Sequence, residues 1–232
     1  MKREYLSFVP IYSVICLAIL VVTALLSRTV TVMSEQAQLE NRHCIIIDAG
    51  HGGVDGGATS CTGVLESGIN LDIALKLNDL MHLMGYETKM VRTTDISIHT
   101  KGNSIASKKA SDLKERVKLV NETEHGILIS IHQNFFQESK YAGAQVFYGQ
   151  TEDSKTLAKV LQNNFAKTIN PNSRRTEKKA SGVYLMENIQ CDGVLVECGF
   201  LSNPEEEVKL RDPAYQKQIC CVIGASVAGF LT

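Results

Sequence analysis

Two histidines and two glutamates stand at points in the sequence where they could act together on one substrate. His51 and His132 follow apolar runs, Glu197 ends a third such run, and Glu66 comes just before a helical pattern. Two imidazoles and a carboxylate are donors that suit a divalent ion, above all zinc (Zn2+), and leave a fourth position for water. A second carboxylate beside such an ion could accept a proton from that water and pass it to a leaving amine.

The apolar runs predict the strands that would position these residues. They cover residues 44–47, 126–132 and 193–197, and each is rich in Ile, Val or Leu. The first run ends at Asp48 and enters a glycine-rich loop that holds His51. Because the carboxyl ends of parallel strands share one edge of a sheet, we expect the four side chains to gather there.

Each of these residues also has an ordinary structural explanation. A histidine that ends a strand is often a hydrogen-bonded loop residue, and Glu66 could be a first-turn helix acid. Glu197 could pair with a basic residue. The four positions are dispersed and show no short metal-binding spacing such as HExxH. Spacing alone therefore leaves both interpretations open.

The remaining pattern alternates between strands and helices, which predicts an α/β fold with a mainly parallel, twisted sheet flanked by helices in a single catalytic domain. The expected helices cover residues 70–84, a segment capped by Ser111, 151–169, a short segment from 203 and 213–231. The other expected strands cover residues 87–91, 142–148 and 183–186, with polar loops at 93–110 and 170–180.

The N-terminus predicts a membrane anchor. Lys2 and Arg3 precede an apolar run at residues 8–26, about the length of a membrane span. A cleaved secretory signal is the alternative, but no clear small-residue cleavage site follows the run. We therefore expect a signal-anchor at residues 1–27, a polar stalk at 28–41 and a catalytic domain at 42–232 outside the cytoplasm.

The composition of the chain indicates which classes of partner and metal site to expect. The net charge of −1 gives no electrostatic case for nucleic acid. The basic residues at 170–180 predict either a solvated loop or a contact with an anionic wall polymer. Seven cysteines include no CxxC pair, so a thiolate zinc site is not indicated and most of them are expected to be structural thiols.

Three blocks of sequence resemble a known family. Residues 48–53 (DAGHGG), 130–134 (SIHQN) and 196–203 (VECGFLSN) are similar to the signature blocks of zinc-dependent N-acetylmuramoyl-L-alanine amidases of the amidase-3 type. They occur in the family's order, and the resemblance covers about residues 44–231. It implies that His51, Glu66 and His132 bind zinc and that Glu197 is the general base and acid. Asn134, in the second block, is a weaker candidate for contacting the substrate.

Within this family the chain resembles the germination-specific, spore-cortex type. The shared features are a short chain with an anchor and no wall-binding repeats, together with residues 100–102, 112–121 and 184–186. This resemblance implies cleavage between the lactyl group of N-acetylmuramic acid and L-alanine. A separate deacetylase would then allow muramic δ-lactam to form, in the space between the forespore membranes.

The resemblance also concerns how the activity is controlled and which other functions are possible. An activating lipoprotein partner is possible for this type, and residues 133–142 are too few for the autoinhibitory helix that some relatives insert there. The alternative function is a weakly active or inactive wall-binding scaffold that needs a partner. A zinc peptidase that cuts within the stem peptide is a third hypothesis, which the order of the motifs disfavours.

Overall fold

The computed structural model describes residues 14–17, 19–24, 28, 43–171 and 173–232, and His43–Thr232 form one structural unit. Of the predicted anchor, residues 14–17 and 19–24 are described and are helical, and of the predicted stalk only residue 28 is described. Among the helices that are described, none is both long enough and apolar enough to cross a membrane.

A six-stranded sheet forms the centre of this unit. Its strands, in sequence, are β1 (Cys44–Ala49), β2 (Glu87–Met90), β3 (Gly126–Asn134), β4 (Gln145–Tyr148), β5 (Lys178–Lys179) and β6 (Asp192–Phe200). Their order across the sheet is β2-β1-β3-β6-β4-β5. Strands β2, β1, β3 and β6 are parallel, whereas β4 runs antiparallel to β6. The predicted, mainly parallel sheet is thus confirmed.

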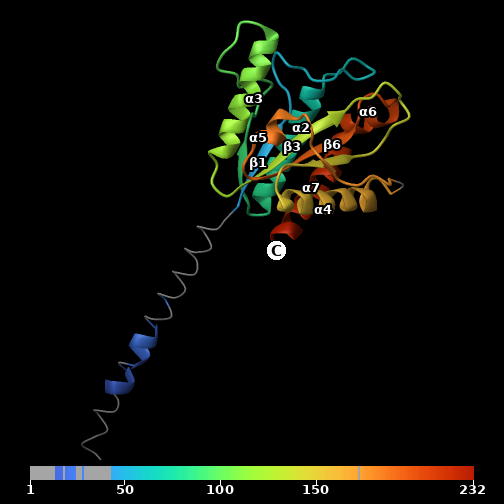
Figure 1. Ribbon diagram of the computed structural model, residues 1–232. Helices are drawn as coiled ribbons and strands as arrows, with labels where there is room; N and C mark the ends of the chain where they lie inside the picture. Colours follow the sequence, from blue (N-terminus) through green and yellow to red (C-terminus); the bar gives the residue numbers. More distant parts are fainter. Residues whose placement is uncertain (1–13, 18, 25–27, 29–42, 172) are drawn as a thin grey trace, which may run out of the picture. The chain divides into compact units, whose positions relative to one another are not determined.

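Helices cover both faces of the sheet (Figure 1). They are α2 (Glu66–Leu83), α3 (Ile105–Asn121), α4 (Glu152–Thr168), α5 (Tyr184–Asn188), α6 (Pro204–Arg211) and α7 (Pro213–Leu231). The side chains of α2, α4 and α7 share one buried apolar cluster with alternate residues of β1, β3 and β6. Helices α3 and α5 cover the other face, where Val120 and Leu185 pack with Ile46 and Leu128. Both faces of the central strands are therefore buried, as in parallel α/β sheets generally.

The sequence explains why α2 forms where it does. Ile69, Ile73, Leu77 and Met81 recur at four-residue steps and are all buried, so one stripe of the helix faces the sheet. Gly85 has a φ of 86° and ends the helix, because a residue with a Cβ rarely adopts that conformation. Helix α2 begins at Glu66, four residues earlier than its apolar pattern indicated.

The predicted start of α3 at Ser111 is wrong. The helix begins at Ile105, and Ser104 is its N-cap, with the Ser104 hydroxyl accepting from the Ser107 backbone N–H. The Ser111 hydroxyl instead accepts from two backbone N–H groups of the preceding loop. The first turns of α3 are largely exposed, so they carry no apolar stripe that the sequence could reveal.

The segment predicted as a strand at residues 183–186 is a short helix. In α5, the Ile189 backbone N–H donates to the Leu185 carbonyl and the Glu187 N–H donates to the Val183 carbonyl. Leu185 and Met186 are buried. Such a short apolar run fits either structure, and packing against α3 decides in favour of the helix.

Three of the seven cysteines are buried, whereas Cys16, Cys61 and Cys221 are exposed and Cys191 is half-buried. Cys44, Cys198 and Cys220 are buried, and burial raises the pKa of the Cys198 thiol well above its usual range. A thiol that stays protonated behaves as a small apolar side chain, which agrees with the predicted role of these residues.

Candidate metal centre and catalytic edge

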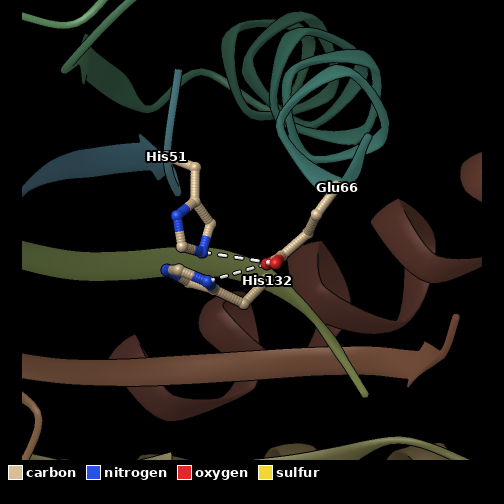
Figure 2. A group of neighbouring side chains, drawn as sticks. All are labelled: His51, Glu66 and His132. Atoms are coloured by element: carbon tan, nitrogen blue, oxygen red, sulfur yellow. Dashed lines mark hydrogen bonds and ion pairs between the residues drawn. The ribbon is translucent and has the colours of Figure 1, made fainter. Parts of the chain in front are cut away.

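The four predicted residues lie at the carboxyl edge of the parallel strands. His51 comes from the loop after β1, Glu66 opens α2 and His132 lies near the end of β3 (Figure 2). One donor atom of each of these three residues lies within 4.8 Å of the others. Glu197 on β6 is the register partner of His132. The structure therefore brings the predicted set together, and their individual roles remain predictions.

Glu66 joins the two histidines. Its Oε2 lies 3.3 Å from His51 Nε2, and its Oε1 lies 3.0 Å from His132 Nδ1. The backbone N–H groups of Ala58 and Gln133 donate to the same carboxylate at 2.9 and 3.1 Å. The register of β3 and β6 shifts between His132 and Asn134, where Gln133 makes this contact, and the extra residue of the bulge lies on β6. Glu66 is also only 3% exposed. These contacts therefore hold its carboxylate between the two imidazoles, away from solvent.

The orientation of His51 is set by Asp55. His51 Nδ1 lies 3.0 Å from Asp55 Oδ2, so the Nε2 atom faces Glu66. Asp55 is held in turn by Lys109 Nζ at 2.8 Å and by the Gly57 backbone N–H at 3.2 Å. A carboxylate on the far nitrogen of a metal-binding histidine fixes its tautomer and raises its basicity. Asp55 therefore acts on the site through His51.

Two glycines leave room for these side chains. A Cβ on Gly50 would lie 2.2 Å from atoms of the His132 ring. A Cβ on Gly57 would lie 2.5 Å from Glu66 Oε2, and Gly57 also has a φ of 69°. Neither position tolerates a side chain without moving a predicted ligand. Their lack of a Cβ is therefore part of how the site is built.

The site favours positive charge. Burial lowers the pKa of His51, but the hydrogen bond and charge of Glu66, followed by those of Asp55, raise it to about 9. Burial alone would raise the pKa of Glu66. Hydrogen bonds from the two histidines outweigh this effect and hold the pKa of Glu66 far below its usual range. A field that favours a proton on His51 also favours a divalent cation between the same atoms.

Glu197 has the environment of a general base. Burial raises its pKa, as does the charge of Glu66, and the opposing charge of His132 leaves it at about 7. Its Oε2 atom is buried and accepts no hydrogen bond from the described residues. A carboxylate with a pKa near neutrality can take and return a proton at physiological pH. Glu197 therefore has the properties that its predicted role requires.

Two buried arginines hold the loop that carries His51. Arg116 of α3 donates to Asp48 and, through Nη2, to the His51 carbonyl at 2.7 Å. Arg92 donates to the Ala49 carbonyl at 2.8 Å and the Gly50 carbonyl at 3.0 Å. His51 has a φ of 61°, which is uncommon for a residue with a Cβ. The arginine contacts hold the loop in this strained conformation.

Asp48→Asn is expected to destabilise the folded domain by about 3 kcal/mol at pH 7, because it leaves the buried Arg116 with a single anionic partner, Asp112. Burial raises the pKa of Asp48, but Arg116 and the Ser130 hydroxyl together lower it below its usual value. The charge of Asp48 therefore stabilises the fold at pH values above about 4, the pKa of this carboxyl in the unfolded chain. This stabilisation is lost as the pH falls below that value and the carboxylate of the folded protein takes up a proton.

Chemical denaturation from pH 7 to pH 3 measures this effect. The difference in unfolding free energy between the wild type and Asp48→Asn should narrow below about pH 4. Asp72→Asn, on the exposed side of α2, is the matched control and should change stability little at either pH. A difference that stays constant across this range would show that the charge of Asp48 does not stabilise the fold.

Sequence reasoning missed Asp55, Arg92 and Arg116 as parts of the site. Leu113 of α3 is exposed, whereas the buried face of the helix carries Asp112, Arg116 and Val120. The four-residue spacing of Asp112 and Arg116 was the available signal, since such pairs meet on one helix face.

Asn134, the weaker substrate candidate, ends β3, and its carbonyl accepts from the Leu201 N–H at 2.8 Å. This contact gives its backbone a structural role, and its contact with substrate remains a prediction. Residues 135–144, between β3 and β4, are all described and contain no helix. The chain between these strands therefore runs as an irregular loop beside the site.

A cleft of about 340 Å³ is lined by three of the four residues, His51, His132 and Glu197. It lies against α3 and α5, whose residues Lys109, Leu113, Tyr184 and Leu185 line it. Asp55 and Arg116, which support the His51 loop, line it as well. The cleft therefore gives a substrate access to the candidate metal ligands and to the candidate base from the same side.

A mainly parallel α/β sheet with two histidines and two glutamates at its carboxyl edge, next to an open cleft, defines a hydrolase domain with a candidate metal centre. Residues 45–228 match the family model Amidase_3, described as N-acetylmuramoyl-L-alanine amidase. The chain therefore belongs to this amidase family. This finding agrees with the resemblance carried by the three sequence blocks.

Individual relatives agree with this assignment. The germination-specific N-acetylmuramoyl-L-alanine amidase of Bacillus subtilis is 36% identical over 190 residues, which span 81% of this chain and 79% of that relative. The CwlD amidase from Clostridioides difficile, solved in complex with the GerS lipoprotein, matches with a TM-score of 0.79 and 35% identity. That match covers 82% of this chain and 98% of the solved chain.

A second solved structure, an N-acetylmuramoyl-L-alanine amidase from Clostridium difficile 630, has a TM-score of 0.70 and 30% identity. It covers 82% of this chain and 97% of its own. The shared fold thus extends over nearly the whole length of each solved amidase domain.

Proposed function

We propose that this chain is a zinc-dependent amidase of peptidoglycan. It hydrolyses the amide bond between the lactyl group of N-acetylmuramic acid and the L-alanine of the stem peptide. The observation that carries this proposal is the position of Glu66 between His51 and His132, with Glu197 beside His132 on the next strand. In a member of this amidase family, that arrangement supplies both a metal site and a base.

The residues present fit zinc. His51, Glu66 and His132 would hold the ion, since two imidazoles and one carboxylate are a ligand set of catalytic zinc sites. The space kept open by Gly50 and Gly57, and the field that favours positive charge, support this assignment. When bound, zinc supplies a Lewis acid that polarises the carbonyl and acidifies water.

Glu197 moves the proton during hydrolysis. Its carboxylate accepts a proton from the attacking water and returns it to the nitrogen of L-alanine as the C–N bond breaks. The products are a lactyl carboxylic acid on the sugar and a stem peptide with a free amine. Asp55 holds the ring of His51, and the two arginines hold the loop, so the reacting groups are fixed before substrate arrives.

The proposed setting is spore-cortex maturation. The relative from Bacillus subtilis is a germination-specific amidase, and we extend that role to this chain. Removal of the stem peptide would leave peptide-free muramic acid, which a separate deacetylase would prepare for muramic δ-lactam formation. An activating lipoprotein is the proposed partner, because the solved CwlD amidase forms a complex with one.

The proposed location is extracytoplasmic, in the forespore intermembrane space, with residues 1–27 as a signal-anchor in the membrane. The apolar run at residues 8–26 and the preceding Lys2 and Arg3 support this topology. The polar residues 28–41 would separate the membrane from the catalytic domain. Peptidoglycan is found on that side of the membrane, which agrees with the proposed substrate.

Product analysis tests the proposed function. The full-length chain with added zinc is incubated with purified cortex peptidoglycan, and the released fragments are identified by mass spectrometry. Stem peptides that begin at L-alanine, lost with a chelator and restored by zinc, are expected. Fragments cut within the stem peptide would identify a peptidase instead. No release by a folded, zinc-loaded chain, with or without a lipoprotein partner, would favour a wall-binding scaffold.

Asp55→Asn is expected to weaken zinc binding by about 10- to 100-fold while the protein remains folded, because a neutral amide holds His51 less well. Competition with a chromogenic chelator measures this affinity. Asp79→Asn, at an exposed position of α2 well past Glu66, is the control and should bind zinc like the wild type. Wild-type affinity in Asp55→Asn would mean that Asp55 does not support the metal site.

A further inference from the structure

Two exposed phenylalanines lie next to the catalytic edge. Phe135 and Phe136 follow β3 directly and are 49% and 48% exposed. At about 3.3 Å per residue, their backbone lies within about 13 Å of the backbone of His132. Large apolar side chains left exposed beside an active site indicate a binding surface.

Contacts with neighbouring residues hold the ring of Phe136 in place. The Phe136 ring meets the Tyr141 ring edge-on, with centroids 5.0 Å apart, and Tyr141 lies 6.1 Å from the buried ring of Phe200. The Phe136 backbone N–H donates to Ser202 Oγ at 3.1 Å, and Asn203 Nδ2 donates to the Tyr141 carbonyl at 3.2 Å. We name Phe135, Phe136 and Tyr141 the aromatic rim.

These hydrogen bonds attach the aromatic rim to the segment that follows β6. Since β6 carries Glu197 and β3 carries His132, the rim is tied to both strands of the site. A rigid aromatic surface loses little conformational entropy when a ligand binds, which favours recognition over a mobile loop. The rim is therefore built as a fixed platform at a fixed distance from the reacting groups.

The size of the rim suits a single ring rather than a protein surface. A phenylalanine side chain buries about 150–250 Å², so two half-exposed ones offer about 200 Å². A stable protein interface takes about 800 Å² from each partner. Cations flank the rim: Lys140 Nζ lies 5.4 Å from the Tyr141 ring centre, and the Arg175 guanidinium lies 5.0 Å from that of Phe200.

We propose that the aromatic rim binds a pyranose ring of the glycan strand, while the stem peptide lies in the cleft against α3 and α5. This inference rests on the proposed function. One face of a pyranose ring presents C–H groups, which are attracted to the electron-rich face of an aromatic ring. Lys140 is paired with Glu138 Oε2 at 2.5 Å, so Arg175 is the cation beside the rim that would meet a carboxylate of a stem peptide carried by the same strand.

Tryptophan fluorescence tests binding without requiring catalysis. The chain has no tryptophan, so Phe136→Trp in the full-length, zinc-loaded protein places a single reporter in the rim. Titration with peptide-free glycan oligosaccharides is expected to change its emission, whereas free stem peptide is expected to leave it unchanged. An emission that does not respond to the glycan would overturn the proposal. Because this readout needs no turnover, it remains informative if the amidase assignment fails.

Kinetics give the second test. Phe135→Ala combined with Phe136→Ala is expected to raise KM for glycan-borne stem peptides about tenfold and to leave kcat unchanged. Phe136→Trp should keep KM close to the wild-type value. The matched control is Leu83→Ala, at the far end of α2, which removes an exposed apolar side chain away from the site.

Thermal melting confirms that the double variant is folded before its kinetics are compared. An unchanged KM in a folded double variant would refute the glycan site. If that variant kept its KM but lost binding to a lipoprotein partner, the rim would be a protein-docking surface instead. A fall in kcat alone would place these residues in the reaction rather than in glycan binding.

Discussion

Glu197→Gln is expected to lower kcat by about 10²- to 10⁴-fold while zinc stays bound. The amide has nearly the shape of the carboxylate but cannot accept the proton of the attacking water. The buried Glu197 Oε2 has no hydrogen-bond partner among the described residues, so the base is poised to act on substrate rather than on the protein. Steady-state kinetics and metal analysis on the same preparation measure both quantities.

Glu205→Gln is the matched control for this substitution. Glu205 lies at the exposed start of α6, close in sequence to the end of β6, and its change should leave both kcat and zinc content as in the wild type. Glu197→Ala should behave like the glutamine variant. Near-normal turnover in either Glu197 variant would remove this residue from the mechanism.

His132→Ala is expected to lose zinc and activity together. Its affinity for zinc should fall by more than about 100-fold, beyond the effect of substituting an outer residue such as Asp55. The imidazole faces Glu66 and packs over Gly50, so alanine leaves two of the three proposed ligands and a widened site. Isothermal titration with zinc measures the loss.

Thermal melting separates this loss from misfolding. Zinc at 100 times its dissociation constant stabilises a folded protein by about 2.7 kcal/mol, so a chelator should lower the melting temperature of the wild type. The chelator should leave the melting temperature of His132→Ala unchanged. His82→Ala, an exposed histidine of α2, should respond to the chelator like the wild type. Zinc-dependent stabilisation of His132→Ala would rule out His132 as a ligand.

The central strands β1, β3 and β6 and the positions of the four site residues could be predicted because their signals are local, whereas β5 lies in a segment expected to be a loop. An apolar run that ends in His132 or Glu197, or that leads into the loop holding His51, reveals both the strand and the end that carries chemistry. Glu66 could be placed because it precedes an apolar stripe of helical period. The fold class followed from the alternation of these elements, and the sheet order required the structure.

The two supporting arginines could not be predicted because their partners are distant in the chain. Arg116 reaches the His51 carbonyl from 65 positions away and depends on where α3 lies. That helix begins with exposed turns, so its true start carries no apolar signal. Asp55 lies in the glycine-rich loop, and only the folded path of the loop turns its carboxylate toward His51.

The register of β3 and β6 has a consequence for protein engineering. His132 and Glu197 face each other on adjacent parallel strands, so their backbones are about 4.8 Å apart whatever the neighbouring loops contain. The loops at residues 135–144 and 201–203 begin only after these positions. Chimeras that exchange such loops between amidases should therefore change which cell walls are digested. The spacing between the proposed ligand His132 and the proposed base Glu197 should stay the same.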